Sequence, residues 1–340
     1  EDAPWGRIAA EAAPAAGTDY AFFMADAASF RAEGDKRLYA ELLAEPGSLH
    51  WIDLEDPTVK EATILEDPFH FHPLAIEDCL AEVHHPKIDD FEDYLYLVVH
   101  GVKAGSQRGE MKTVELDVVI EKNTLVTFRR EEMRSISETW QRAMTRPGFL
   151  AHGPVHVLQS ILSAQADHYI DEVENLQKDI YDLETSVFAA RRPAGFERQV
   201  FAVKHDIARL RQILGSQREI VHRIGRGDFP EVPKRMIMVF RDVYVHLYRA
   251  TEMLDTLRDL SMALLETHLA LVANRTNQVM RVLTTVATFI LPLSLVTGWF
   301  GMNFRELAGL GMESPDLFVL GLFGVITISM VLLLRRGGWM

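Results

Sequence analysis

Histidine and cysteine are the side chains of this sequence that could form a zinc site or the metal centre of an enzyme. Four histidines lie close together in the chain, at His70, His72, His84 and His85. Imidazole is a common zinc ligand, but these four lack a HExxH frame and an obvious spacing for a third ligand. Cys79 is the single cysteine, which excludes a disulfide within the chain and a cysteine-based zinc cage. We expect His72 to begin a helix, the other three to lie on the surface, and the protein not to be an enzyme.

The charge of the chain limits its partners. Its 340 residues include 49 acidic and 35 basic side chains, a formal net charge of −14 at pH 7. Phosphate binding needs a basic face, so nucleic acid is not an expected partner. An acidic chain suits the handling of cations, although the same charge would also keep a cytoplasmic domain soluble. The sequence has no Walker-type glycine-rich loop ending in lysine, so we expect no nucleotide-driven step.

Two apolar stretches near the C-terminus have the length of membrane spans. Val282 to Phe300 carries no charged residue, and as a helix it would cover about 28 Å, the thickness of the hydrocarbon core of a bilayer. Leu317 to Leu334 is also uncharged and precedes Arg335 and Arg336. Basic residues border the outer ends of both stretches, and acidic residues predominate between them, which places both termini in the cytoplasm. We predict transmembrane helices at 282–300 and 317–334 and an external loop at 301–316.

The first part of the chain is predicted to be a cytoplasmic α/β domain. Residues 1–18 are rich in Ala, Pro and Glu, and we expect a flexible segment without a signal peptide there. An α/β domain is predicted for residues 19–150, because short runs rich in β-branched and aromatic residues alternate with helical patterns. The predicted strands are Tyr20 to Met24, Leu49 to Leu54, Tyr94 to Val102, Val114 to Ile120 and Thr124 to Arg129, and the predicted helices include Phe30 to Ala44 and Leu74 to Ala81.

Long helices follow this domain. Pro154 suits the first turn of a helix, and breaks near residues 190 and 228 indicate a helical hairpin over 151–230. Lys234 to Phe300 then contains no Gly or Pro except Pro292 and Gly298. A helix of that length is stable only if it packs along others. We divide it into a cytoplasmic stalk at 231–281 and the span at 282–300, and we assign 335–340 as a basic cytoplasmic tail.

The periodicity of the stalk indicates what it packs against. Apolar positions alternate four and three residues apart at Met236, Phe240, Val243, Leu247, Ala250, Leu254, Leu257, Ser261 and Leu264. The pattern slips by one position and resumes at Leu265, Leu269, Val272, Thr276, Val279 and Leu283. This coiled-coil seam runs into the predicted span, so the bundle it forms should do so too. Such a seam is more often a simple stalk than the wall of a pore.

The segment GWFGMNF at Gly298 to Phe304 resembles the signature of the CorA family of divalent-cation channels. The resemblance extends to FRDVY at Phe240 to Tyr244, to NRTNQVMRVLTTVATFILPLSLVTG at Asn274 to Gly298, and to HPLAIEDCL at His72 to Leu80 with the HPKIDDFEDYLYLV that follows. It implies a funnel-shaped homopentamer in the inner cell membrane, with an α/β cytoplasmic domain, a long-helix stalk and two C-terminal transmembrane helices.

In such a pentamer, one stripe of the long helix would line the pore. Residues three and four apart share a face, and this stripe contains Asn277, Met280, Leu283, Ala287, Leu291, Ser294 and Gly298. Small or polar members would leave room for a hydrated ion, and the large apolar ones could close the path by dewetting. Without the resemblance, ordinary helix packing would be the preferred explanation of the same stripe.

Asn303 is the residue that we expect to select the ion. Mg²⁺ gives up its waters reluctantly, so a ring of neutral amide oxygens can bind its water shell, whereas a carboxylate ring would hold the ion too tightly. Gly301 would permit the close turn that places this ring, and Met302 would pack behind it. An Asn at this place could also serve simply as a helix C-cap.

The resemblance also implies that intracellular metal between subunits closes the channel. Asp78 and Asp242 match the positions of the carboxylate pair that holds this ion, and Glu77 and Asp167 are weaker candidates for a neighbouring site. Bound Mg²⁺ would offset the repulsion between carboxylates of adjacent subunits, and its loss would loosen the assembly. Each carboxylate taken alone could be an ordinary solvated surface charge.

Two alternative functions remain open. The external segment FRELAGLGMESPD replaces the acidic MPEL-like segment that is commonest in the family, and Arg305 lies close to the predicted pore mouth. The choice of metal is therefore open, and the zinc-transporting ZntB branch, with proton-coupled uptake, is one alternative to Mg²⁺ with Co²⁺ or Ni²⁺ as further substrates. A non-conducting, membrane-anchored scaffold or metal sensor is the other.

Overall fold

The structure is a computed structural model that describes residues 20–26, 49–56, 65–67, 69–81, 85–103, 109–146, 148–188, 195–301 and 315–336. The chain divides into two compact units, Glu1–Leu264 and Leu265–Met340. The predicted helix at Phe30 to Ala44 lies outside the described residues.

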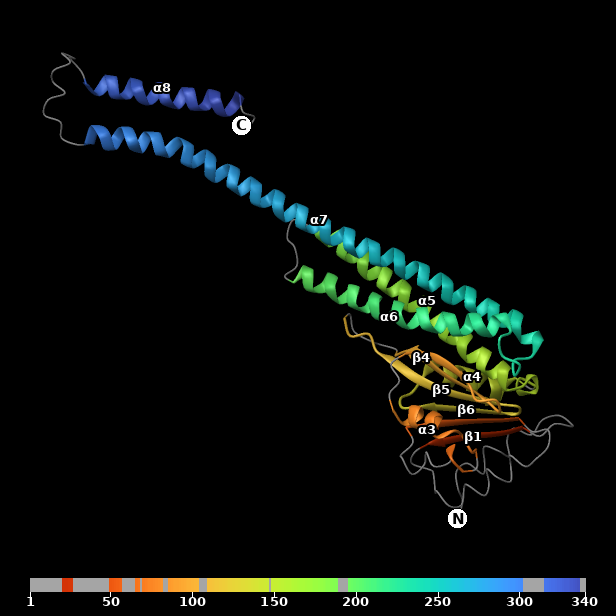
Figure 1. Ribbon diagram of the computed structural model, residues 1–340. Helices are drawn as coiled ribbons and strands as arrows, with labels where there is room; N and C mark the ends of the chain where they lie inside the picture. The colour runs from red at the N-terminus through yellow and green to blue at the C-terminus, as the bar shows by residue number, and fades with distance from the viewer. Residues whose placement is uncertain are drawn as a thin grey trace. The chain divides into compact units, whose positions relative to one another are not determined.

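Within the described residues of the first unit, six strands form one mixed sheet (Figure 1). The order across the sheet is β1, β2, β6, β5, β4, β3. The strands are β1 (Tyr20–Asp26), β2 (Leu49–Glu55), β3 (Lys87–Asp90), β4 (Leu95–Val102), β5 (Thr113–Glu121) and β6 (Thr124–Arg129). Strand β2 pairs in parallel with β1 and β6, and the remaining neighbours are antiparallel.

All five predicted strands are confirmed, but the prediction missed β3. This strand has four residues, KIDD, of which only Ile88 is buried and apolar. Three charged residues in four do not give the apolar alternation by which a strand is identified in a sequence. Its identity as a strand comes from pairing with β4, in which Lys87 lies opposite Val98 and Ile88 opposite Leu97.

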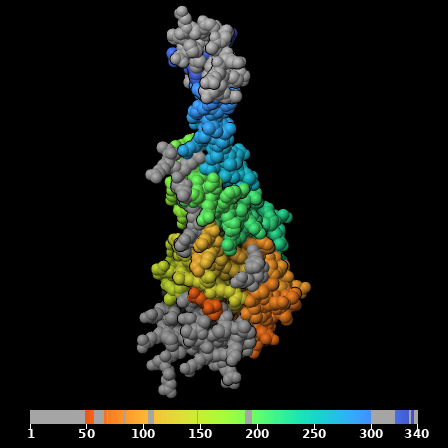
Figure 2. Space-filling view, turned by 90° about the vertical axis from the view of Figure 1, so that its left-hand side faces the viewer, coloured from red at the N-terminus to blue at the C-terminus, as the bar shows by residue number. Residues whose placement is uncertain are grey.

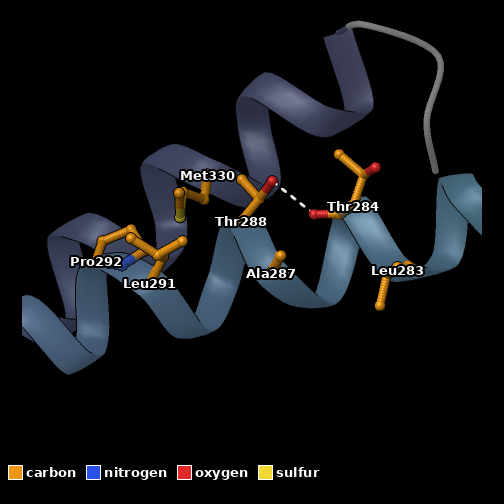
Figure 3. A pocket seen from close by; sticks show the side chains of 7 residues that line it. All are labelled: Leu283, Thr284, Ala287, Thr288, Leu291, Pro292 and Met330. Atoms are coloured by element: carbon orange, nitrogen blue, oxygen red, sulfur yellow. Dashed lines mark hydrogen bonds between the residues drawn. The ribbon is translucent and has the colours of Figure 1, made fainter.

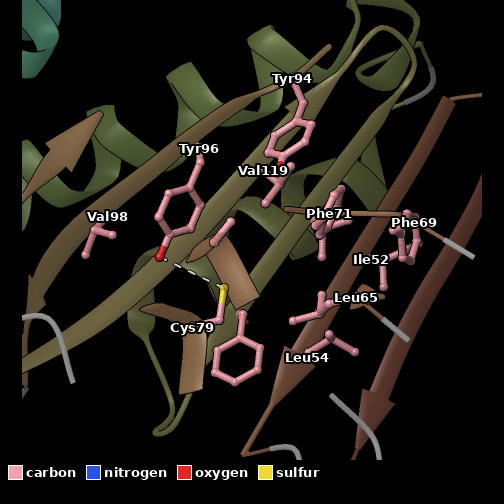
Figure 4. Packing of buried hydrophobic residues seen from close by; sticks show 13 residues of the cluster. Ile52, Leu54, Leu65, Phe69, Phe71, Cys79, Tyr94, Tyr96, Val98 and Val119 are labelled. Carbon is pink, nitrogen blue, oxygen red and sulfur yellow. Dashed lines mark hydrogen bonds between the residues drawn. The ribbon is translucent and has the colours of Figure 1, made fainter. Parts of the chain in front are cut away.

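The two faces of the sheet are covered by different helices. Helix α3 (Pro73–Leu80) covers one face, where its Cys79 and Ala75 join a cluster that includes Ile52, Phe71 and Tyr96 (Figure 4). Helices α4 (Arg134–Thr145) and α5 (Pro154–Val187) pack on the opposite face. The rings of Trp51 in β2 and Trp140 in α4 are 4.9 Å apart there. The sheet is therefore the core of the first unit, because it is buried on both sides.

Helices α6 (Phe196–Arg226) and α7 (Lys234–Gly301) complete the first unit. Figure 2 shows the green α6 and the teal start of α7 side by side on its surface, where Arg211 of α6 forms an ion pair with Asp255 of α7. All nine residues of the first predicted seam, from Met236 to Leu264, are buried. Near the second of the two predicted breaks, Gly227 caps α6 with a left-handed φ of 82°.

The second unit contains the end of α7 and helix α8 (Pro315–Arg336). Within it, part of α7 is long and apolar enough to cross a membrane, and none of that part is buried. The predicted external loop lies outside the described residues except at Gly301, Pro315 and Asp316.

Candidate ion pathway and regulatory carboxylates

The predicted seam changes character where the two units meet in the sequence. Up to Leu264 it is buried within the chain, but beyond Leu265 its side chains are exposed, including Leu269, Val272 and Val279. The slip by one position in the sequence coincides with this boundary. An apolar stripe that finds no cover in its own chain is typical of a surface that packs against lipid or another subunit.

The predicted pore stripe lies on this exposed part of α7. All of its seven residues, from Asn277 to Gly298, are exposed in the single chain, and Leu291 retains 70% of its surface. A side chain added at Gly298 would meet no atom within 4 Å. Packing within one chain therefore does not require glycine at this position. The stripe is available to face lipid or another subunit.

A groove between α7 and α8 borders the same stripe (Figure 3). Its volume is about 450 Å³, and its lining consists of Leu283, Thr284, Ala287, Thr288, Leu291, Pro292 and Met330. Met330 of α8 lies near Thr288, Leu291 and Pro292. The Thr288 hydroxyl donates a hydrogen bond of 2.7 Å to the Thr284 carbonyl, so this polar group is satisfied within its own helix. The groove has no ionisable lining residue, and three members of the stripe lie beside α8.

The predicted selectivity residues are only partly described. Gly301 is the last residue of α7, and Met302 and Asn303 lie outside the described residues. Selection by an amide ring therefore stays a prediction from the sequence.

Asp78 lies in the last turn of α3, which its own capping groups and the sheet hold in place. His72 accepts a hydrogen bond of 3.2 Å from the Leu74 amide on Nδ1, so it caps the helix as predicted. The His72 amide donates a hydrogen bond of 2.7 Å to the Tyr94 hydroxyl. Within the chain Asp78 forms an ion pair with Lys87, and 31% of its side chain remains exposed. Its carboxylate is thus fixed on the surface with a cation beside it.

The other predicted metal ligands lie on separate elements. Asp242 is exposed on α7, and no ion pair or hydrogen bond joins its side chain to another described residue. Asp167 on α5 lies 3.5 Å from His246 of α7, one turn after Asp242, and Glu77 is exposed on α3. Among the described residues, no group of three or more His, Cys, Asp or Glu side chains could hold a metal. One chain alone therefore does not assemble the predicted site.

The surface prediction for two of the other early histidines is confirmed. His70 and His85 are exposed, and His84 lies outside the described residues. The His85 ring lies 3.5 Å from the amide of Gln212 on α6. Together with the capping contact of His72, this arrangement brings no zinc-binding cluster into the described part of the chain.

A buried polar group lies directly under α3 (Figure 4). The Tyr96 hydroxyl donates a hydrogen bond of 2.5 Å to Asp117 Oδ1. The Cys79 sulfur lies 4.0 Å from the same hydroxyl, and Figure 4 shows this second contact. Burial raises the pKa of Asp117 to about 8; Glu115 and Asp78 add to this effect, while the Tyr96 hydrogen bond and Arg130 oppose it. Burial also raises the pKa of Cys79 well above its usual range. The Asp117 carboxyl and the Cys79 thiol therefore favour their protonated forms in the core.

The sequence model of the CorA-like Mg²⁺ transporter protein family matches residues 46–336. The chain belongs to this family.

Relatives that are named for the transport of different ions align with most of this chain. The cobalt/magnesium transport protein CorA of Thermotoga maritima is 28% identical over 273 residues, which are 80% of this chain and 78% of that protein. The zinc transport protein ZntB of Yersinia pestis is 23% identical, over 79% of this chain and 81% of that protein. The solved structure of the CorA magnesium transporter from Methanocaldococcus jannaschii superposes with a TM-score of 0.73 and 21% identity, covering 85% of this chain and 91% of that one.

The family resemblance did not indicate three residues that surround Asp78. Lys87 pairs with it directly, and Tyr96 and Asp117 lie beneath its helix. A signal for Lys87 was present, because Lys87 and Asp89 are two residues apart and would share one face of a strand. KIDD does not have the pattern of a strand in the sequence, because three of its four residues are charged, and this conceals the signal. The burial of Asp117 had no local signal, since β5 alone does not show which helix covers it.

Proposed function

We propose that this protein is a membrane channel for the uptake of divalent cations, chiefly Mg²⁺, with Co²⁺ and Ni²⁺ as further substrates. Membership of the CorA family over residues 46–336 carries this proposal, because the matched range includes the exposed apolar end of α7 and the Gly301, Met302, Asn303 motif. The Thermotoga relative is named for the transport of cobalt and magnesium.

In this proposal five copies surround a pore, and α7 and α8 both cross the inner cell membrane. The exposed stripe on α7 would then face the pore axis or a neighbouring copy, which explains why its seven residues remain exposed in the single chain. The basic residues Arg335 and Arg336 after α8 keep that end in the cytoplasm, as Arg275 and Arg281 do before the first span. Asn303 would ring the outer mouth and select the hydrated ion.

The membrane potential supplies the driving force. A divalent cation that moves inward across about 100 mV gains about 4.6 kcal/mol, twice the value for one charge. Intracellular Mg²⁺ between subunits would close the channel through Asp78 of one copy and Asp242 of the next, with Glu77 and Asp167 nearby. The separation of these carboxylates onto different elements supports a site between copies.

One observation favours a second candidate function, the proton-coupled uptake of Zn²⁺. A relative of similar coverage is named a zinc transport protein. The motif at Gly301, Met302 and Asn303 ranks Mg²⁺ above this alternative, whereas the external segment departs from the commonest CorA pattern.

Ion uptake into liposomes under an inside-negative potential tests both functions. The experiment compares wild type, Asn303→Ala, and the matched control Asn175→Ala, which alters an exposed amide on α5. Mg²⁺ flux that follows the voltage, ignores a pH gradient and disappears only in Asn303→Ala supports the channel. Zn²⁺ flux that follows the pH gradient supports the second function, and the absence of flux for both ions supports a scaffold or sensor.

A further inference from the structure

The ammonium of Lys87 has three neighbours that hold it beside Asp78. It forms an ion pair with Asp78 Oδ2, lies 2.9 Å from Asp89 Oδ2, and lies 5.2 Å from the centre of the Tyr96 ring. Only 32% of the Lys87 side chain is exposed. A lysine with two carboxylates and an aromatic face around it is not a freely moving surface charge.

The groups that hold Lys87 are themselves fixed by the sheet. Asp89 is two residues along β3 and so shares the face of Lys87, and Ile88 between them is buried against the core. The Tyr96 ring is fully buried, and its hydroxyl donates to Asp117. The position of the ammonium is therefore a property of the fold rather than of a chance rotamer.

The two principal carboxylates of the proposed regulatory site differ in this respect. Asp78 already has a cation of its own chain beside it, whereas Asp242 has no ion pair with any described residue. A divalent cation that approaches Asp78 meets a carboxylate that already shares an ammonium with Asp89. Binding must either displace the ammonium or accept repulsion between a unit charge and a double charge a few ångströms apart.

We propose that Lys87 is a built-in competitor of the regulatory divalent cation at Asp78, and that it raises the ion concentration at which the site fills. This inference rests on the proposed function, because it assumes that Asp78 binds metal between subunits. When the metal binds, Lys87 leaves Asp78 but keeps Asp89 and the Tyr96 ring, so it is not left unpaired. When the metal leaves, Lys87 returns and neutralises Asp78.

Lys87 thus helps to set the ion concentration at which the site fills, and it does not itself bind the metal. Its removal should tighten metal binding, which is opposite to the effect of removing a ligand. This sign separates competition from a purely structural contribution, because a variant that merely loosened α3 would bind the metal more weakly.

The test measures the Mg²⁺ concentration that half-protects the full-length protein in nanodiscs from subtilisin, which does not need lysine for cleavage. The variants are Lys87→Met, Lys87→Arg, Asp78→Asn and the double variant Asp78→Asn with Lys87→Met. Lys103→Met is the matched control, because it removes an exposed lysine that pairs with Glu131 and not with Asp78.

We expect Lys87→Met to lower the half-protecting concentration by about tenfold, a size consistent with one unit charge beside a divalent ion near the surface. Lys87→Arg and Lys103→Met should stay within about twofold of wild type. Asp78→Asn should lose the Mg²⁺ protection, and adding Lys87→Met to it should not restore this protection. The temperature of unfolding without Mg²⁺ checks that each variant is folded.

An unchanged or raised half-protecting concentration in Lys87→Met overturns the inference, provided that wild type is protected and Asp78→Asn is not. Absence of Mg²⁺ protection in wild type, or protection that Asp78→Asn leaves intact, overturns the regulatory site itself and the inference with it. The two failures are therefore distinguishable.

Discussion

Tyr96 of β4 donates a hydrogen bond of 2.5 Å to Asp117 of β5 beneath helix α3. The two residues are diagonal neighbours in the sheet, since Tyr96 lies opposite Val119 and Asp117 opposite Val98. Both side chains are buried, so the sheet carries a carboxyl group in its core next to the helix that bears Asp78.

Asp117 should make the stability of the first unit depend on pH. Its folded-state pKa is about 8, above the ordinary value of 3.8, so the folded protein binds this proton more tightly than the unfolded chain. The resulting stabilisation is complete below about pH 4 and is lost as the pH rises through 8. We expect the unfolding temperature of wild type to fall between pH 6 and pH 9 and that of Asp117→Asn to fall less.

Differential scanning fluorimetry of the full chain in detergent measures this difference. Asp171→Asn, an exposed carboxylate on α5, is the control and should retain the slope of wild type. Parallel slopes for wild type and Asp117→Asn would show that Asp117 is already ionised in the folded state.

Breaking the buried ion pair between Asp53 and Arg129 should strongly reduce the free energy of unfolding. Arg129 Nη2 lies 2.8 Å from Asp53 Oδ2, and the exposed fractions of the two side chains are 3% and 0%. Arg129→Met would leave a buried carboxylate without its cation, which typically reduces the free energy of unfolding by about 3–5 kcal/mol. Removing both charges in Asp53→Asn with Arg129→Met should cost less than Arg129→Met alone.

An exposed ion pair of the same unit provides the comparison. Arg211 and Asp255 form an ion pair, and both side chains are substantially exposed. Arg211→Met removes this pair and should reduce the free energy of unfolding by less than about 1 kcal/mol. Urea unfolding followed by tryptophan fluorescence compares the variants. Equal losses for Arg129→Met and Arg211→Met would contradict the importance of burial.

Asp206 should hold the entry to β5 against α6. The residue is only 2% exposed. Its carboxylate accepts hydrogen bonds from the backbone amides of Gly109, at 2.5 Å, and Met111, at 3.1 Å. Asp206→Ala would leave both amides unsatisfied, and we expect a loss of about 2–4 kcal/mol. Asp206→Asn keeps one acceptor and should lie between Asp206→Ala and wild type.

Hydrogen exchange gives a local measurement of the same change. The amides of Gly109 and Met111 should exchange faster in Asp206→Ala, while the ladder amide of Val119 in the middle of β5 should change little. A uniform acceleration across β5 would indicate global destabilisation and not the loss of this anchor.

Asp242 offers a direct test of the regulatory site, because no described residue pairs with it. Without Mg²⁺, Asp242→Asn should change the free energy of unfolding by less than about 0.5 kcal/mol, as expected for an exposed substitution. It should raise the half-protecting Mg²⁺ concentration by about tenfold or more, because a neutral amide is a weaker ligand than a carboxylate. Asp259→Asn, an exposed carboxylate on the same helix, is the control. Identical Mg²⁺ curves for all three proteins would remove Asp242 from the site.

The helical part of the first unit could be predicted from sequence in detail. The seam from Met236 to Leu264 was predicted from apolar residues three and four apart, and each of its residues is buried. A helix that buries one face must repeat in this way whatever its partner is, so the pattern is local. The five apolar strands were predictable because a strand that is buried on both faces is a short, nearly continuous run of apolar residues.

The candidate site was only partly predictable. The sequence by itself determined the helices, five of the six described strands, the capping by His72, the apolar end of α7 and the resemblance to the CorA family. The tertiary structure decided that KIDD is a strand, that Lys87 pairs with Asp78, and that Asp117 is buried under α3. These features depend on which segments lie beside one another across the sheet, and a contact between distant elements leaves no periodic trace in either of them.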